Sequence, residues 1–202
     1  MNLGQLRTEV RLRATVPSTD GMWTDAFVNS AINEALLQLS TEHAWPWLQK
    51  SATATPSALG VVDLSAFSPL VRDIAHVFVG QIEAHPVSAA ESDATSDPSG
   101  YTYSVWGDTL QIRPVTTDTV TVRYYANEAL LTADSGTPTM PAVYHPCIAE
   151  KACAIGFESL DDQSSAGMHE ARSRQIVAHM VATALRRIRG RHSVRIRPGH
   201  PY

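Results

Sequence analysis

Gln175-Ile-Val-Ala-His-Met-Val-Ala-Thr-Ala-Leu-Arg-Arg-Ile-Arg189 is the stretch around which this 202-residue chain is organised. Apolar residues recur in it at helical spacing, namely Ile176, Met180, Ala184 and Ile188. This spacing predicts a long helix that buries one face. Gly190 is expected to end the helix, because glycine readily takes the left-handed conformation found at helix C-termini. The remaining residues, 190–202, are expected to form an extended arm.

Basic residues are concentrated at the C-terminal end of the chain. Residues 171–202 contain eight arginines and no acid, a net charge of +8, whereas residues 1–170 contain 20 acids and eight basic residues, a net charge of −12. This division predicts an acidic body that carries a basic arm. Arginine also suits interfaces, because its planar guanidinium can form paired hydrogen bonds.

The sequence contains no recognisable catalytic or metal-binding motif. Glycine-rich phosphate loops and the G-x-S-x-G elbow are absent, and the eight histidines do not form the i, i+4 pairs of a helical zinc site. We expect the histidines to lie at the surface or to cap helices, and Cys147 and Cys153 to be buried free thiols. No signal peptide is evident, and no apolar run approaches the roughly 18 residues of a membrane span. We therefore predict a soluble, non-enzymatic protein made in a cytoplasm, without metals or other cofactors.

Both ends of the chain have helical periodicity. Helices are predicted over residues 3–15, 25–43, 142–160 and from about 168 to 189, and the four should pack as one bundle. Val143 is expected to point inward. The predicted core of the bundle comprises Leu6, Val10, Val28, Ile32, Leu36, Leu39, Ile148, Ile155, Ile176, Met180 and Ile188.

Between these helices the period changes to two residues, which indicates β structure. Residues 101–126 are predicted to form a three-stranded antiparallel meander with a tight turn at Gly107-Asp108. Shorter strands are expected at residues 51–55, 60–64, 74–79 and 81–85.

Together these patterns predict an α+β fold that is mainly α: a bundle of about four helices, an inserted antiparallel β-meander domain and an extended C-terminal arm. The predicted boundaries are 1–48 for the N-terminal helices of the bundle, 49–140 for the inserted β-domain, 141–189 for the C-terminal helical hairpin and 190–202 for the arm.

Trp45 and Trp47 flank Pro46 at the end of the second predicted helix. Our first interpretation is that these tryptophans cover a core. The second is that they anchor an interface, because tryptophan is enriched in interface hot spots.

Three interpretations of the basic arm remain open: a solvated tail, a nucleic-acid-binding segment that releases counterions, or a segment that docks on another protein. Docking is favoured because residues 193–197 alternate apolar and basic side chains, the pattern of a strand added to a partner's sheet. Nucleic-acid binding is disfavoured because no aromatic residues are interleaved for base stacking. The residues predicted to dock are Arg186, Arg187, Arg189, Arg191, Val194, Arg195, Ile196 and Arg197.

Four segments of the chain resemble the head-to-tail adaptor (connector) proteins of tailed bacteriophages. They are Ala31-Ile-Asn-Glu-Ala-Leu-Leu-Gln-Leu39, Glu42-His-Ala-Trp-Pro-Trp47, Tyr124-Tyr-Ala-Asn-Glu-Ala-Leu-Leu131 and Pro138-Thr-Met-Pro-Ala-Val-Tyr-His145. The resemblance implies a helical bundle with an inserted small β-domain and an extended C-terminus. It further implies a ring, commonly a dodecamer, beneath the portal, with the C-terminal segment docked on the portal and the β part facing the tail. Double-stranded DNA would pass through the channel of this ring.

We therefore expect a structural virion protein made in the host bacterial cytoplasm. Its expected partners are the portal protein, tail or head-completion proteins and further copies of itself, with no membrane and no sequence-specific DNA contact. An alternative is a DNA-binding packaging or regulatory protein that uses the arginine cluster between Arg186 and Arg197. A weaker alternative is a hydrolase of an unrecognised type.

Overall fold

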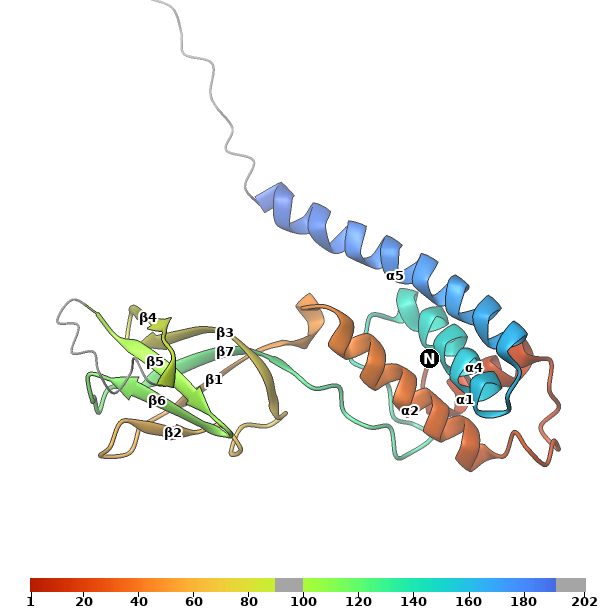
Figure 1. Cartoon of the computed structure of the whole chain (residues 1–202), viewed down its shortest axis with the longest axis horizontal. Coiled ribbons are helices and arrows are strands. Elements are labelled where there is room, and N and C mark those ends of the chain that lie inside the picture. Colours follow the sequence, from red (N-terminus) through yellow and green to blue (C-terminus); the bar gives the residue numbers. More distant parts are fainter. Residues whose placement is uncertain (90–99, 192–202) are drawn as a thin grey trace, which may run out of the picture. The chain divides into compact units, whose positions relative to one another are not determined.

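The computed structural model describes residues 1–89 and 100–191, with side chains described as far as Ala184 (Figure 1). The chain forms two compact units in it. The helical unit comprises Met1–Leu39 and the chain from Leu130 onward, and the β unit comprises Ser40–Ala129.

The helical unit is built from α1 (Leu3–Ala14), α2 (Asp25–Glu42), α4 (His145–Ser159) and α5 (Gln163–Arg191), with a short 3₁₀ turn, η2 (Ala142–Tyr144), before α4. Polar side chains cap three of these helices. Asn2 and Gln5 form a reciprocal capping box on α1. Thr24 accepts a hydrogen bond from the Phe27 amide at the start of α2 (3.3 Å), and Asp162 accepts one from the Ser165 amide at the start of α5 (3.1 Å).

Polar contacts also join segments of the helical unit that are distant in sequence. Asp25 at the start of α2 accepts hydrogen bonds from Arg7 (3.1 Å) and Arg11 (2.7 Å) of α1. The Asn33 side chain on α2 donates to the carbonyl of Leu131 (3.1 Å) and accepts from its amide (2.8 Å). This pair fixes the chain where it returns to the helical unit, and it brings together two of the segments that carry the adaptor resemblance.

The predicted core residues of α1, α2 and α4 are all buried. On α5, Met180 is buried but Ile176 is only half-buried, and the Ile188 side chain lies outside the described part of the chain. The predicted apolar stripe and the buried face of α5 do not coincide, because the buried face begins with the small and polar residues Ala166, His169 and Ser173.

Two local predictions for the helical unit are wrong. Val143 is 73% exposed, because it lies in the 3₁₀ turn before α4 rather than on the inner face of the helix. Gly190 does not end α5, which continues to Arg191. A glycine inside a helix costs only about 1 kcal/mol relative to alanine, so a glycine alone does not stop a helix.

The β unit contains a seven-stranded mixed sheet in the order β1-β7-β3-β4-β5-β6-β2, as far as its residues are described. The strands are β1 (Gln49–Ala54), β2 (Val61–Asp63), β3 (Val71–Val79), β4 (Ile82–Pro86), β5 (Thr102–Trp106), β6 (Thr109–Arg113) and β7 (Val120–Ala126). A 3₁₀ turn, η1 (Pro46–Leu48), leads into β1. Neighbouring strands pair antiparallel except β4 and β5, which run parallel.

The prediction of a mainly α protein with a small β-meander is therefore wrong. The hairpin of β5 and β6 forms as predicted, with Gly107 in the left-handed conformation that its turn requires (φ 56°). However, β6 pairs with β2 on its other side, and β7 lies between β1 and β3. As an inner strand, β7 buries Val120, Val122 and Tyr124 in the core of the sheet, so its alternating pattern predicts a strand without predicting its neighbours.

Candidate interaction surfaces

The predicted portal-binding residues fall at and beyond the end of α5. Arg186, Arg187, Arg189 and Arg191 lie on its last turns, where only the backbone is described, and Val194, Arg195, Ile196 and Arg197 lie outside the described residues. α5 has 29 residues and α4 has 15, and α5 begins just after α4 ends. At 1.5 Å per residue, α5 therefore exceeds α4 by about 21 Å. The excess is at the C-terminal, arginine-rich end of α5 (Figure 1).

Trp45 and Trp47 stack on each other in the β unit, with ring centroids 4.7 Å apart and planes 14° apart. His43 packs edge-on against Trp45. Trp45 is buried, whereas Trp47 keeps part of its surface exposed. Arg72 of β3 donates hydrogen bonds to the carbonyls of Ser40 and His43, which ties this segment to the sheet.

A buried carboxylate, Glu150 of α4, connects three helices. It accepts a hydrogen bond from Arg13 of α1 and lies 2.7 Å from Nδ1 of His169 on α5. The His169 ring is 1% exposed and stacks on Phe157. Burial by itself lowers the pKa of Arg13, but its hydrogen bonds to Glu9 and Glu150 outweigh that effect and raise it.

The expectation that histidines lie at the surface or cap helices is thus wrong for His169, and it is also wrong for His145, which is 3% exposed and whose ring nitrogens bond to groups outside its helix. His145 satisfies both of its ring nitrogens: Nε2 lies 2.9 Å from the Met140 carbonyl and Nδ1 lies 2.5 Å from the Met1 amino group. Both rings serve packing and hydrogen bonding inside the helical unit.

A second, more exposed ion pair lies on the same pair of helices. Glu170 of α5 contacts Lys151 of α4 at 2.9 Å and Arg174 at 3.0 Å. Partial burial raises the pKa of the Glu170 carboxyl, but the ion pairs with Lys151 and Arg174 outweigh it, so the pKa is lowered.

Both cysteines are free and buried, as predicted. Burial, with a contribution from the charge of Glu150, raises the pKa of Cys153 to about 12. Its thiol therefore stays protonated and unreactive at neutral pH. Among the described residues, no three His, Cys, Asp or Glu side chains are grouped as metal ligands would be. No helix in that part of the chain is long and apolar enough to cross a membrane.

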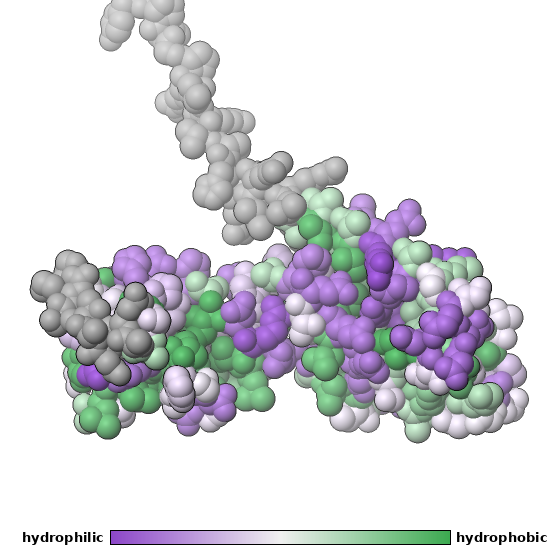
Figure 2. Space-filling view, viewed as in Figure 1, coloured by the Kyte–Doolittle hydropathy of each residue, from purple (hydrophilic) through white to green (hydrophobic). Residues whose placement is uncertain are grey.

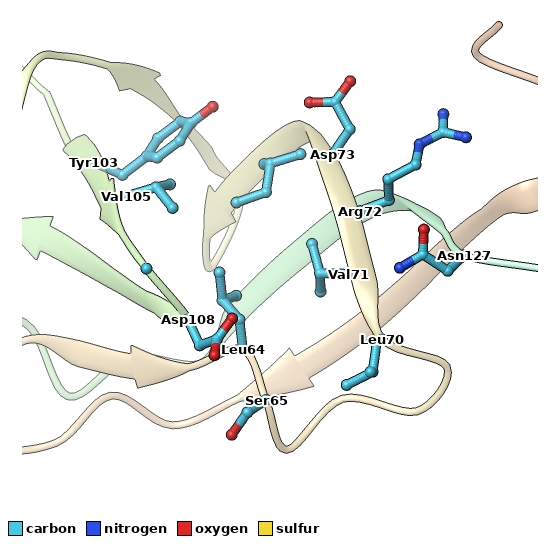
Figure 3. A pocket seen from close by; sticks show the side chains of 12 residues that line it. Leu64, Ser65, Leu70, Val71, Arg72, Asp73, Tyr103, Val105, Asp108 and Asn127 are labelled. Carbon is cyan, nitrogen blue, oxygen red and sulfur yellow. The ribbon is translucent and has the colours of Figure 1, made fainter. Parts of the chain in front are cut away.

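The β unit has a hollow of about 700 Å³ between β3 and β5 (Figure 3). Tyr103 and Val105 of β5 lie on one side, and Val71 and Asp73 of β3 lie on the other. Asp108, in the turn after β5, also lines it. Apolar surface is visible on this unit in Figure 2, and the exposed apolar side chains near the hollow include Leu70 (57% exposed), Val105 (45%) and Trp106 (78%).

Residues 1–200 match the family model of the SU10 adaptor proteins. The chain belongs to this family. A comparison with curated proteins gives no match. The match confirms the resemblance to phage head-to-tail adaptors, and it extends over nearly the whole chain rather than over four segments. The adaptor is therefore a bacteriophage protein with a structural role between head and tail, and a component of the virion.

Sequence reasoning missed two features of this adaptor. One is Glu150, whose signal is an acid in the stretch Cys147–Ile155, where Lys151 is the one other charged residue and the remaining residues are small or apolar. The other is the hollow, for which the sequence holds no such signal, because its lining comes from four separate segments of the β unit.

Proposed function

We propose that this adaptor forms a ring below the portal, joins the capsid to the tail and continues the DNA channel. The observation that carries the proposal is α5, which exceeds its neighbour α4 by about 21 Å and bears four arginines in its last six residues. A helix of this kind can reach a second protein ring with its basic end while its first half stays packed in the helical unit.

The docking residues are those predicted from the sequence: Arg186, Arg187, Arg189 and Arg191 on α5, followed by Val194, Arg195, Ile196 and Arg197. Arginine suits such a contact because it pairs with carboxylates in a fixed geometry. Trp47, which is partly exposed, is the member of the tryptophan pair that offers surface to a partner, and Trp45 supports it from beneath.

The charge of the chain suits a ring through which DNA slides. Residues 1–170 carry a net charge of −12. A body with net negative charge does not attract the phosphate backbone, because binding to DNA depends mainly on lysine and arginine contacts that release counterions. We propose a dodecamer, with tail or head-completion proteins as further partners and DNA passing without sequence-specific contacts.

The proposal is tested by mixing the full chain with purified portal rings and imaging the product. We expect the protein to co-sediment with portal and to add a ring at one end of it. Deletion of Arg191–Tyr202 should leave the melting temperature within about 1 °C, because the described core excludes these residues, while it abolishes co-sedimentation. Full-strength binding by the deletion variant would place the contact elsewhere.

A parallel measurement addresses the DNA-binding alternative. The protein is sized with and without double-stranded DNA at low and high salt. A DNA-binding protein would shift in size with DNA and lose that shift steeply as salt rises, whereas we expect no shift at physiological salt.

A further inference from the structure

A tight turn at one end of the β unit presents an exposed leucine. Leu59 lies in the turn between β1 and β2 and is 73% exposed. The Gly60 amide donates to the Ser57 carbonyl (2.8 Å), and the Gly60 carbonyl accepts from the Ile112 amide of β6 (2.8 Å). A Cβ atom at Gly60 would lie 2.7 Å from the Ile112 carbonyl oxygen, so the turn packs closely against β6. Leu59 is therefore held toward solvent on a fixed backbone.

The residues at the end of β6 enlarge this surface. Pro114 is exposed, and Val115 is 46% exposed. Val115 lies beside the turn, because a Cβ atom at Gly60 would be 3.4 Å from its Cγ2 atom. Arg113, the last residue of β6, has no hydrogen-bond or ion-pair partner for its guanidinium among the described residues. We name Leu59, Pro114 and Val115 the apolar tip, which thus has an unpaired cation next to it.

The hollow lies at the other end of the same two strands. The turn with Leu59 precedes β2, whereas Leu64 follows β2 and lines the hollow. The Leu64 amide donates to the carbonyl of Asp108, which precedes β6 and also lines the hollow (2.8 Å). The five residues of β6 span about 17 Å. The β unit therefore carries an apolar protrusion and a recess at opposite ends of β2 and β6.

The lining of the hollow complements the apolar tip in polarity and charge. Val71 and Val105 supply apolar side chains (Figure 3). Asp73 and Asp108 are exposed, and neither carboxylate has a hydrogen-bond or ion-pair partner in the described part of the chain. The cation in the lining, Arg72, instead donates to backbone carbonyls. The volume of about 700 Å³ is within the range in which proteins hold drug-sized ligands. A few side chains of a turn can therefore enter it.

Surfaces at opposite ends of one β unit can meet only between two copies of the chain. A contact between two different surfaces of identical subunits repeats from copy to copy and can close into a ring. A two-fold contact that joined hollow to hollow would stop at a dimer. It would also bring Asp73 and Asp108 of both copies together, and such juxtaposition of like charges is unfavourable. Charge complementarity therefore favours the apolar tip, with Arg113, as the occupant.

We infer that the apolar tip of one copy inserts into the hollow of the next copy. Leu59 packs on Val71 and Val105, and Arg113 lies beside the carboxylates of the hollow. Each copy gives one tip and receives one, so the same contact recurs around the assembly. This inference rests on the ring of the proposed function and identifies the contact between its subunits.

Disulfide trapping in the assembly on portal rings tests the contact. The double variant Ala58→Cys, Ser65→Cys leaves Leu59 and the apolar lining intact, and both positions are exposed. They are separated by β2, whose three residues span about 10 Å. A disulfide needs Cα atoms within about 7 Å, so this pair can bond only between copies. Mild oxidation should give a ladder of covalent multimers beyond the dimer.

The control is Ala58→Cys with Ser51→Cys, because Ser51 is exposed on β1 outside the hollow. The native cysteines are buried and free in both variants. Equal trapping in the two variants, or trapping that stops at the dimer, would refute the contact. Co-sedimentation with portal and no ladder would refute the contact alone and leave the ring proposal standing. Loss of co-sedimentation by the unmodified chain would overturn both.

Two substitutions in the trapping variant test the residues of the contact. Leu59→Ser should slow the ladder by about tenfold or more, because burying a leucine side chain is worth at least that factor. Ile82→Ser, at a 55% exposed position outside the tip and the hollow, should leave the rate unchanged. An unchanged rate with Leu59→Ser would refute the role of the tip.

The charge complementarity is tested by exchange. Arg113→Asp should slow the ladder, and adding Asp108→Arg should restore it, because the exchange re-forms a pair of opposite charges across the contact. Melting temperatures of the variants check that each keeps its fold. If Asp108→Arg fails to restore trapping, Arg113 does not lie beside the hollow of the next copy.

Discussion

Replacing Gly156 of α4 with alanine should destabilise the helical unit, although the same change inside most helices is stabilising. A Cβ atom at Gly156 would lie 2.5 Å from Cη2 and 2.9 Å from Cζ3 of Trp23. Trp23 is 3% exposed and is held edge-on by Phe27 and Phe157, so its ring cannot move aside without disturbing both neighbours. Gly156 therefore provides the surface on which the indole packs.

The magnitude follows from two opposing effects. Alanine is favoured over glycine inside a helix by about 1 kcal/mol, whereas forcing extra atoms into a packed core costs about 1–3 kcal/mol. We expect Gly156→Ala to lower the free energy of unfolding by about 1 kcal/mol. Gly167 of α5 is the control, because a Cβ there would meet no atom within 4 Å. Gly167→Ala should raise the free energy of unfolding by about 0.5–1 kcal/mol.

The assay is urea denaturation followed by circular dichroism at 222 nm, with thermal melting as a check. For a protein of this size, 1 kcal/mol corresponds to about 2–4 °C in melting temperature. Trp23→Leu should remove the clash, so adding Gly156→Ala to that variant should be stabilising by about the helix propensity difference. If Gly156→Ala and Gly167→Ala change stability equally, the packing of Trp23 on Gly156 is not as described.

Three further predictions concern packing, a turn and pH. Leu36→Ala should cost about 2–5 kcal/mol, whereas Leu37→Ala, at a 47% exposed position on the same helix, should cost far less, as measured by urea denaturation. Gly107→Val should cost about 1–2 kcal/mol because its φ of 56° strains any side chain, and thermal melting of the β unit checks this. Glu170→Gln should lower stability at pH 7, because the lowered pKa of Glu170 contributes stability above its ordinary value of 4.5. That difference, measured by urea denaturation at each pH, should shrink as pH falls through the folded-state pKa of Glu170.

The helices could be predicted because their signals are local. Leu6, Ile32 and Ile148 each sit in a 3.6-residue repeat, and all three are buried. His169 and Ser173 were missed because the buried face of α5 uses polar side chains whose partners lie on other helices. A periodicity argument counts such residues as exposed, whatever their environment in the fold.

The individual strands could be predicted from the sequence, but their pairing and order in the sheet could not. Val120 and Val122 alternate as in any half-buried strand, and their pattern is the same whether the neighbour is β6 or β3. The pairing of β7 with β1 joins residues about 70 positions apart, such as Ser51 and Arg123, and no short-range pattern encodes it. The hollow depends on long-range contacts too, because its lining joins Leu64 and Leu70 to Tyr103 and Asn127.

The polar contact between α4 and α5 has a consequence for how far α5 extends. Glu150 is 4% exposed, and it is satisfied only when His169 and Arg13 are opposite it. A slip of α5 by one turn would move His169 by about 5.4 Å and leave a buried carboxylate without that partner. Breaking a buried pair in this way costs about 3–5 kcal/mol, whereas sliding one apolar face along another costs less, so the polar contact selects a single register. If the basic end of α5 is the portal contact, as proposed, this register fixes the distance between the helical unit and its partner. The double variant Glu150→Gln, His169→Leu should therefore weaken co-sedimentation with portal, although it changes no docking residue.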